Sequence, residues 1–146
     1  MSQPDFAPLA RTLRELVQSF VRDAPRGTLS RTAAGTLSVL DRHGPQRVTA
    51  LAEHEVITQP AMTGLLQRME SAGLVERRED PDDGRASLIG ITDAGHEALQ
   101  ARRQQQDAVI AAKLAHLSPD DLAALDAAAP ALTHLSQITE SHDLVR

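Results

Sequence analysis

Residues 79–85 bring a run of carboxylates next to a single arginine. Four acidic residues fall within five positions, and one glycine and one arginine follow them: Glu79, Asp80, Asp82, Asp83, Gly84 and Arg85. Short apolar runs flank this segment at residues 74–75 and 88–89. Two kinds of chemistry suit such a segment, namely cation binding by the carboxylates and anion binding by the guanidinium.

The spacing of the acidic residues excludes an EF-hand calcium loop. Such a loop needs glycine at its sixth position and glutamate at its twelfth. A loop that started at Asp80 would place Arg85 and Ile91 at these positions. A loop that started at Glu79 would have Gly84 at the sixth position but Gly90 at the twelfth.

The arginine itself suits nucleic-acid binding. A guanidinium at the tip of a hairpin can enter a DNA minor groove, where negative potential is concentrated. We expect Asp83 to pair with Arg85 and to fix its direction, while the other acidic side chains face solvent. The alternative is a plain acidic turn, because the sequence DPDDG at 80–84 is also good turn chemistry.

A second group of polar residues lies on one face of a predicted helix. Thr58 can cap this helix, and Gly73 is a natural left-handed residue at its end. Its apolar face is formed by Met62, Leu65, Leu66 and Met69, and its free face by Gln59, Thr63, Gln67 and Arg68. Glutamine can bond adenine, arginine can bond guanine, and threonine can contact phosphate or a thymine methyl group. The alternative is an ordinary surface helix, whose outer face is polar without reading bases.

Apolar spacing and capping residues predict the elements that position these two groups. In chain order they are helices over 9–21, 30–43, 49–54 and 58–72, strands over 74–78 and 86–91, a long helix over 92–116 and a last helix from Ser118. The two strands should form a hairpin. Pro130 should kink or split the last helix. Apolar stripes on the first and last helices exceed what a small core needs, so they predict a dimer.

Composition excludes several classes of site. The chain has no cysteine, which excludes disulfides, thiolate metal sites and cysteine redox switches. Its only aromatic residues are Phe6 and Phe20, so stacking of bases on an aromatic platform is not expected. No compact histidine ligand spacing, phosphate-binding glycine loop or hydrolase motif occurs. We therefore expect no metal, no cofactor and no enzymatic activity.

Length and charge set further bounds. The 146 residues are enough for one domain, and no apolar run approaches the roughly 20 residues that span a bilayer. No apolar secretory segment follows Met1, so we expect a cytoplasmic protein without a membrane partner. The net charge is -5, yet Lys113 is the only lysine among 15 basic residues. Arginine suits bidentate contact with phosphate and guanine, although a GC-rich genome would give the same bias.

Two adjacent stretches together resemble the MarR family (multiple antibiotic resistance regulators) of bacterial transcription factors. They are TALAEHEVITQPAMTGLLQRMESAGLVERR at 49–78 and DPDDGRASLIGITDAG at 80–95. The resemblance rests on the helix-turn-helix pattern, on GLVERR, on the DP-D-x-R wing and on T-x-x-G. It implies a mainly α fold with a small β-hairpin, in a single domain over 1–146. A winged helix-turn-helix would occupy 30–91, with dimerisation helices at 5–24 and 92–142.

The resemblance also implies a function. Members are homodimers that bind a palindromic operator in double-stranded DNA and usually repress, and many release it when a small phenolic or aromatic effector binds. By position it implies DNA contacts by the recognition helix through Gln59, Pro60, Thr63, Gln67 and Arg68, and by the wing through Arg85 with Asp83 as its partner. Because the net charge is negative, binding would depend on a local basic surface made of Arg47, Arg68, Arg77, Arg78 and Arg85.

Three positions depart from the family pattern. Gly64 stands where an arginine is frequent, Val56 where the turn commonly has glycine, and Gly84 where the wing commonly has a first arginine. Together with the acidic charge, Gly64 and Gly84 support an alternative function. In that alternative the chain is a winged-helix protein-interaction module without specific DNA binding.

Overall fold

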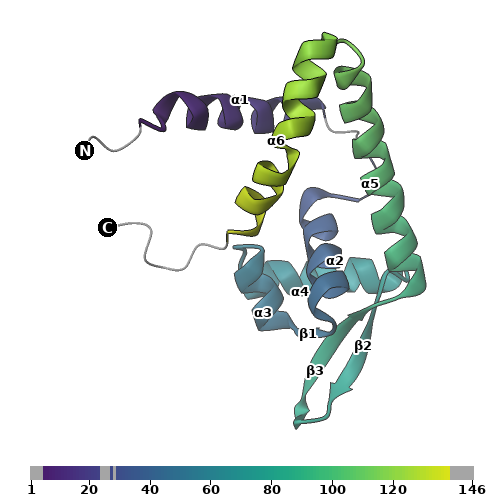
Figure 1. The fold of residues 1–146 in the computed structure, drawn as a ribbon. Coiled ribbons are helices and arrows are strands. Elements are labelled where there is room, and N and C mark those ends of the chain that lie inside the picture. The colour runs from purple at the N-terminus through teal and green to yellow at the C-terminus, as the bar shows by residue number, and fades with distance from the viewer. Residues whose placement is uncertain (1–4, 24–26, 28, 139–146) are drawn as a thin grey trace. The chain divides into compact units, whose positions relative to one another are not determined.

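The computed structural model describes residues 5–23, 27 and 29–138. In chain order the elements are α1 (Ala7–Asp23), α2 (Arg31–His43), β1 (Gln46–Arg47), α3 (Val48–His54), α4 (Gln59–Ser71), β2 (Val75–Asp80), β3 (Asp83–Ile91), α5 (Asp93–Leu114) and α6 (Pro119–Gln137), as drawn in Figure 1. The chain divides into two units, Met1–Asp107 and Ala108–Arg146, with the boundary inside α5. The expected class, mainly α with a small β-hairpin, is confirmed, and a third short strand joins the hairpin in one sheet.

Helices α2, α3 and α4 share one hydrophobic core in the first unit. Leu37, Leu51 and Leu66 are each 0% exposed, and they pack with Ile89 of β3 and Leu99 of α5. The predicted apolar face of α4 is confirmed, since all four of its residues are buried: Met62, Leu65, Leu66 and Met69. Caps also lie where the sequence places them. Ser30 Oγ accepts a bond of 3.1 Å from the amide of Ala33 and so begins α2.

The sheet has three strands in the order β1-β3-β2, all antiparallel. The sequence predicted only the β2–β3 hairpin, because β1 has two residues and is too short to show an alternating pattern. Both hairpin strands also reach further than predicted, so that Asp80 pairs directly with Asp83 across the turn. Figure 1 shows the hairpin as a ribbon extending away from α2, α3 and α4.

The T-x-x-G motif ties the end of α4 and the base of the hairpin to the start of α5. Thr92 Oγ1 donates a bond of 2.5 Å to the carbonyl of Gly73 and accepts one of 3.1 Å from the amide of Gly95. A β-carbon on Gly95 would collide with the carbonyl oxygen of Leu74. Gly95 is therefore needed for a close backbone approach, and Gly73 for its positive φ of 73°.

Polar contacts fasten the first half of α5 to α2. The carboxylate of Asp41 lies 3.1 Å from Arg103 Nη2 and 3.1 Å from His96 Nδ1. Arg102 Nη1 also donates a bond of 2.9 Å to the carbonyl of Leu29, just before α2. The first half of α5 is thus held against α2 by charged side chains as well as by the buried Leu99.

Helices α1 and α6 each carry apolar side chains that the structure leaves exposed. On α1, Leu9 and Val17 are 60% and 59% exposed, and on α6, Leu135 is 51% exposed. Helix α6 begins at Ser118, whose Oγ accepts from the amide of Asp121 at 3.1 Å, as predicted. It runs through Pro130 as one helix, so of the expected kink or split, the split does not occur. Residue 24 and residues 139–142 of the expected dimerisation segments lie outside the described residues.

Candidate nucleic-acid interface

Helix α4 presents a polar face opposite its buried one. Gln59, Pro60, Gln67 and Arg68 are exposed, and Thr63 is half-buried. The helix starts at the Thr58 cap, whose Oγ1 accepts from the amide of Ala61 at 3.3 Å. These five predicted contact residues therefore share one helix. That they contact DNA bases is a prediction from the sequence.

The structure shows two details of this face that the sequence pattern did not predict. Thr63 Oγ1 donates a bond of 3.0 Å to the carbonyl of Gln59, so its oxygen is left to act as an acceptor. The guanidinium of Arg68 lies beside Gly64, with Nη1 3.7 Å from the position that a β-carbon there would take. Gly64 thus leaves the side of Arg68 open, whereas a longer residue at position 64 would contact it.

The turn before α4 contains the only non-glycine residue with positive φ in the described chain. Val56 has φ of 53° and is 89% exposed. A β-branched side chain is strained in the left-handed region and gains little burial here in return. The turn is held by the amide of Ile57, which donates to the carbonyl of Ala52 at 3.0 Å. Valine at position 56 therefore keeps the turn geometry but lowers the stability of the fold.

Glu55, next to this turn, has its carboxylate against Gly35 of α2. A β-carbon at Gly35 would collide with the Glu55 carboxylate oxygens, so glycine makes the room that this side chain occupies. Burial raises the pKa of Glu55 above its ordinary value, and the nearby His54 opposes the rise. Sequence reasoning missed this contact, because nothing local links residues 35 and 55.

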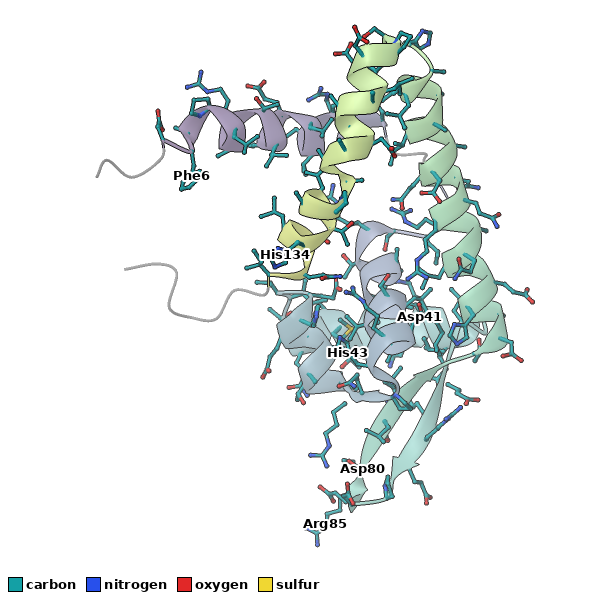
Figure 2. All side chains as sticks on the ribbon, viewed as in Figure 1. Phe6, Asp41, His43, Asp80, Arg85 and His134 are labelled. Atoms are coloured by element: carbon teal, nitrogen blue, oxygen red, sulfur yellow. The ribbon has the colours of Figure 1, made fainter. Side chains whose placement is uncertain are left out.

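The hairpin carries Arg85 at its tip, but Asp83 does not hold it as expected. Figure 2 shows Asp80 and Arg85 near this tip, with Arg85 directed away from the hairpin. Asp83 Oδ1 accepts a bond of 3.1 Å from the backbone amide of Arg85. No ion pair joins the two side chains, and within the described residues the Arg85 guanidinium has none at all. The expected pairing is therefore wrong, since the carboxylate fixes the backbone of the turn instead.

The aspartate that does bind a guanidinium is Asp80, and its partner is Arg47. Arg47 donates from Nε at 2.8 Å and from Nη2 at 2.5 Å to the same oxygen, Asp80 Oδ2. Asp80 Oδ1 accepts from the amide of Asp82 at 2.9 Å. The expectation that Asp80 faces solvent is thus wrong, because its side chain is 5% exposed. The amide of Asp82 first, and then Arg47, lower the pKa of Asp80 below its ordinary value.

The remaining two arginines of the predicted basic surface are paired as well. Arg77 Nε lies 3.2 Å from Glu70 Oε2 on α4. Arg78 donates from Nε at 2.7 Å and from Nη2 at 2.5 Å to Glu76 Oε1, two residues away on the same strand face. Sequence reasoning missed both acidic partners. The Glu76–Arg78 spacing was the one usable signal, because residues i and i+2 share a strand face.

An open groove of about 330 Å³ brings two of these arginines together. It is lined by Arg47, Val48, Thr49, Arg77, Ala86 and Ser87. Guanidinium and hydroxyl groups are the donors that commonly contact DNA phosphates. The groove thus joins the start of α3 to both hairpin strands, and it adds Thr49 and Ser87 to the candidate contacts.

In the described part of the chain, no group of three or more His, Cys, Asp or Glu residues could hold a metal ion. No helix there is both long enough and apolar enough to cross a membrane.

Comparison with known proteins assigns the winged helix-turn-helix to a family. The sequence model described as "MarR family" matches residues 29–87. An uncharacterized HTH-type transcriptional regulator of Mycobacterium bovis is 30% identical over 105 residues, which is 72% of this chain and 73% of that protein. The chain belongs to the MarR family. It is thus a winged-helix, DNA-binding transcriptional regulator by family.

Two more distant proteins are similar to this chain, one in fold and one in sequence. The solved structure of a MarR family protein from Bacillus stearothermophilus has the same fold, with a TM-score of 0.72 at 18% identity over 94% of this chain and 99% of that one. The HTH-type transcriptional repressor IacR of Pseudomonas putida is 22% identical over 94 residues, which is 64% of this chain and 52% of that protein.

Proposed function

We propose that this MarR family protein is a dimeric repressor that binds a palindromic operator and leaves it when a small phenolic or aromatic effector binds. The observation that carries the DNA-binding part is the exposed face of α4. Its buried side fixes the helix against the core, while Gln59, Gln67 and Arg68 stay exposed, and Arg68 has no ion pair within the described residues.

The wing supplies the second part of the proposed contact. Arg85 extends from the hairpin tip, and its backbone is fixed by Asp83. In the proposed complex α4 enters a major groove and reads base edges, while Arg85 enters the neighbouring minor groove. In the same complex, the protein groove at the start of α3 and the hairpin faces DNA phosphates. The groups that would contact them are Arg47, Arg77 and the hydroxyls of Thr49 and Ser87.

The dimer is proposed from the apolar faces of α1 and α6. Apolar faces of this kind are typical of protein–protein contacts. A dimer would present two α4 helices to successive major grooves, about 34 Å apart. Light scattering at micromolar concentration tests this step, and a monomeric mass would contradict it. In the dimer, effector binding shifts the population toward an arrangement whose helices no longer match that spacing.

The experiment that tests the proposed function is binding to the DNA upstream of the chain's own gene. Fluorescence anisotropy at about 150 mM salt, with a scrambled duplex as competitor, measures both affinity and specificity. A repressor should prefer its operator by at least about 10³-fold. The second candidate, a protein-interaction module, is favoured by the acidic partners of Arg47, Arg77 and Arg78, and it predicts no such preference.

A further inference from the structure

The five arginines of the basic surface fall into two groups. Arg47, Arg77 and Arg78 are each bound to a carboxylate, whereas Arg68 and Arg85 have no ion pair within the described residues. Counting arginines therefore overstates the positive charge that this surface offers to DNA.

The three ion pairs differ in how firmly the carboxylate is held. The Asp80 side chain is 5% exposed and also accepts a backbone hydrogen bond, so it belongs to the hairpin turn. The side chains of Glu70 and Glu76 are 40% and 47% exposed. Exposed ion pairs of this kind change an equilibrium constant by no more than about five-fold. Solvent or a competing anion can therefore separate them.

We propose that Glu70 and Glu76 act as built-in counter-ions that DNA phosphates displace from Arg77 and Arg78. This inference rests on the proposed function, and it concerns how the same surface is regulated. In the free protein each glutamate neutralises its arginine. In the complex the arginine turns to a phosphate, and the released carboxylate, which now lies near DNA, takes up a cation from solution.

This exchange changes the salt dependence of binding. Each phosphate neutralised by a cation of the protein normally contributes about -0.9 to the slope of log K against log salt concentration. Where a glutamate takes up a cation at the same time, cation release and uptake offset each other. Arg77 and Arg78 should then contribute little to the slope. The two Glu–Arg ion pairs therefore weaken binding to any duplex. The contacts that depend on sequence, through Arg68 and its neighbours, then dominate binding.

Charge-neutral variants of the two glutamates test the proposal. We would measure the affinity of the full chain for a scrambled duplex across a salt series, for the wild type, Glu70→Gln and Glu76→Gln. The matched control is Glu79→Gln. Glu79 is exposed on the same strand as Glu76 and has no ion pair within the described residues. Glu79→Gln therefore makes the same change in charge without releasing an arginine.

The expected result separates pairing from overall charge. Glu70→Gln and Glu76→Gln should each raise affinity about two- to five-fold at low salt and make the slope steeper by about 1 per protomer. Glu79→Gln should leave the slope unchanged. The proposal is overturned if the two variants keep the wild-type slope, or if the control steepens it equally.

The same data distinguish this proposal from the proposed function. If the wild type ignores its operator but Glu70→Gln and Glu76→Gln gain affinity for the scrambled duplex, the counter-ion role stands and the repressor does not. If neither the wild type nor any variant binds a duplex, both are wrong.

Discussion

Arg47 and Asp80 join two parts of the winged helix-turn-helix that lie 33 residues apart in sequence. Two donors of the Arg47 guanidinium bind one oxygen of Asp80, and the other oxygen accepts the amide of Asp82. The pair links β1, just before α3, to the last residue of β2 at the hairpin turn. Asp80 therefore gives the hairpin a fixed attachment near its tip, which is where Arg85 needs a defined direction.

Removing the Asp80 charge should loosen the hairpin. We expect Asp80→Asn to lower the melting temperature at pH 7, because the Arg47 guanidinium loses its ionic partner. The folded pKa of Asp80 lies below the unfolded value of about 3.9. The stabilisation is thus present above that value and is lost as the pH falls through the folded pKa. The difference in melting temperature between the wild type and the variant should therefore be full above about pH 4 and should shrink progressively as the pH falls below it.

Thermal unfolding followed by circular dichroism from pH 7 to pH 3 checks this prediction. Asp82→Asn is the matched control, because it removes the same charge from an exposed neighbour. Equal melting temperatures for the two variants at pH 7 would show that the Arg47–Asp80 pair does not stabilise the fold.

The turn of the helix-turn-helix should gain stability from glycine. Val56 sits at φ of 53°, where a non-glycine residue costs about 1–2 kcal/mol. Part of that gain is lost to the greater freedom of glycine in the unfolded chain. We expect Val56→Gly to stabilise by about 1 kcal/mol, which corresponds to a rise of roughly 2–4 °C in melting temperature.

Differential scanning calorimetry measures this effect, with Val56→Ala as a comparison. Alanine lacks the β-branch but keeps a β-carbon, so its melting temperature should lie between those of the wild type and the glycine variant. A lower melting temperature for Val56→Gly would mean that the valine side chain contributes contacts that outweigh its backbone strain.

The close approach at Gly95 should not tolerate even one methyl group. A β-carbon there collides with the carbonyl oxygen of Leu74, which is backbone and cannot rotate away. We expect Gly95→Ala to destabilise by about 1–3 kcal/mol through the shift it imposes on α5 or the hairpin base. Gly84→Ala is the control, since nothing lies within 4 Å of its β-carbon position. Urea unfolding of both variants tests this prediction, and equal unfolding midpoints would contradict it.

The helical part of the fold was largely predictable from sequence, because caps and apolar spacing are local signals. Ser30, Thr58 and Ser118 all cap helices where expected, and α4 buries its predicted face. Strand β1 was missed because two residues carry no periodicity. The partners in the wing were only partly predictable. Asp80 and Arg47 are 33 residues apart, and no local pattern links them.

The same reason explains the error at Arg85. Sequence proximity favoured a side-chain pair with Asp83, but the turn places the Asp83 carboxylate on the backbone amide of Arg85. An aspartate two residues before an amide commonly makes such a turn. The basic surface was likewise predicted by adding up arginines, and three of the five prove to be bound to carboxylates.

Arg68 and Arg85 should contribute differently to DNA binding. In the proposed complex Arg68 reads a base in the major groove, so Arg68→Ala should cost about 1–3 kcal/mol and relax specificity at that base. Arg85→Ala should weaken binding and reduce any preference for the narrow minor groove of A·T-rich flanks. Anisotropy titrations with operator variants measure both effects. If Arg68→Ala weakened operator and scrambled duplexes equally, Arg68 would be a phosphate contact and not a base reader.

The affinity of the full chain for the duplex upstream of its own gene tests sequence-specific DNA binding most directly. The measurement is fluorescence anisotropy at about 150 mM salt against a scrambled duplex, followed by an unbiased selection from random DNA if the upstream duplex fails. We expect a preference of at least about 10³-fold for one palindromic sequence. A protein that selects no sequence in either experiment would contradict it and would favour the protein-interaction module.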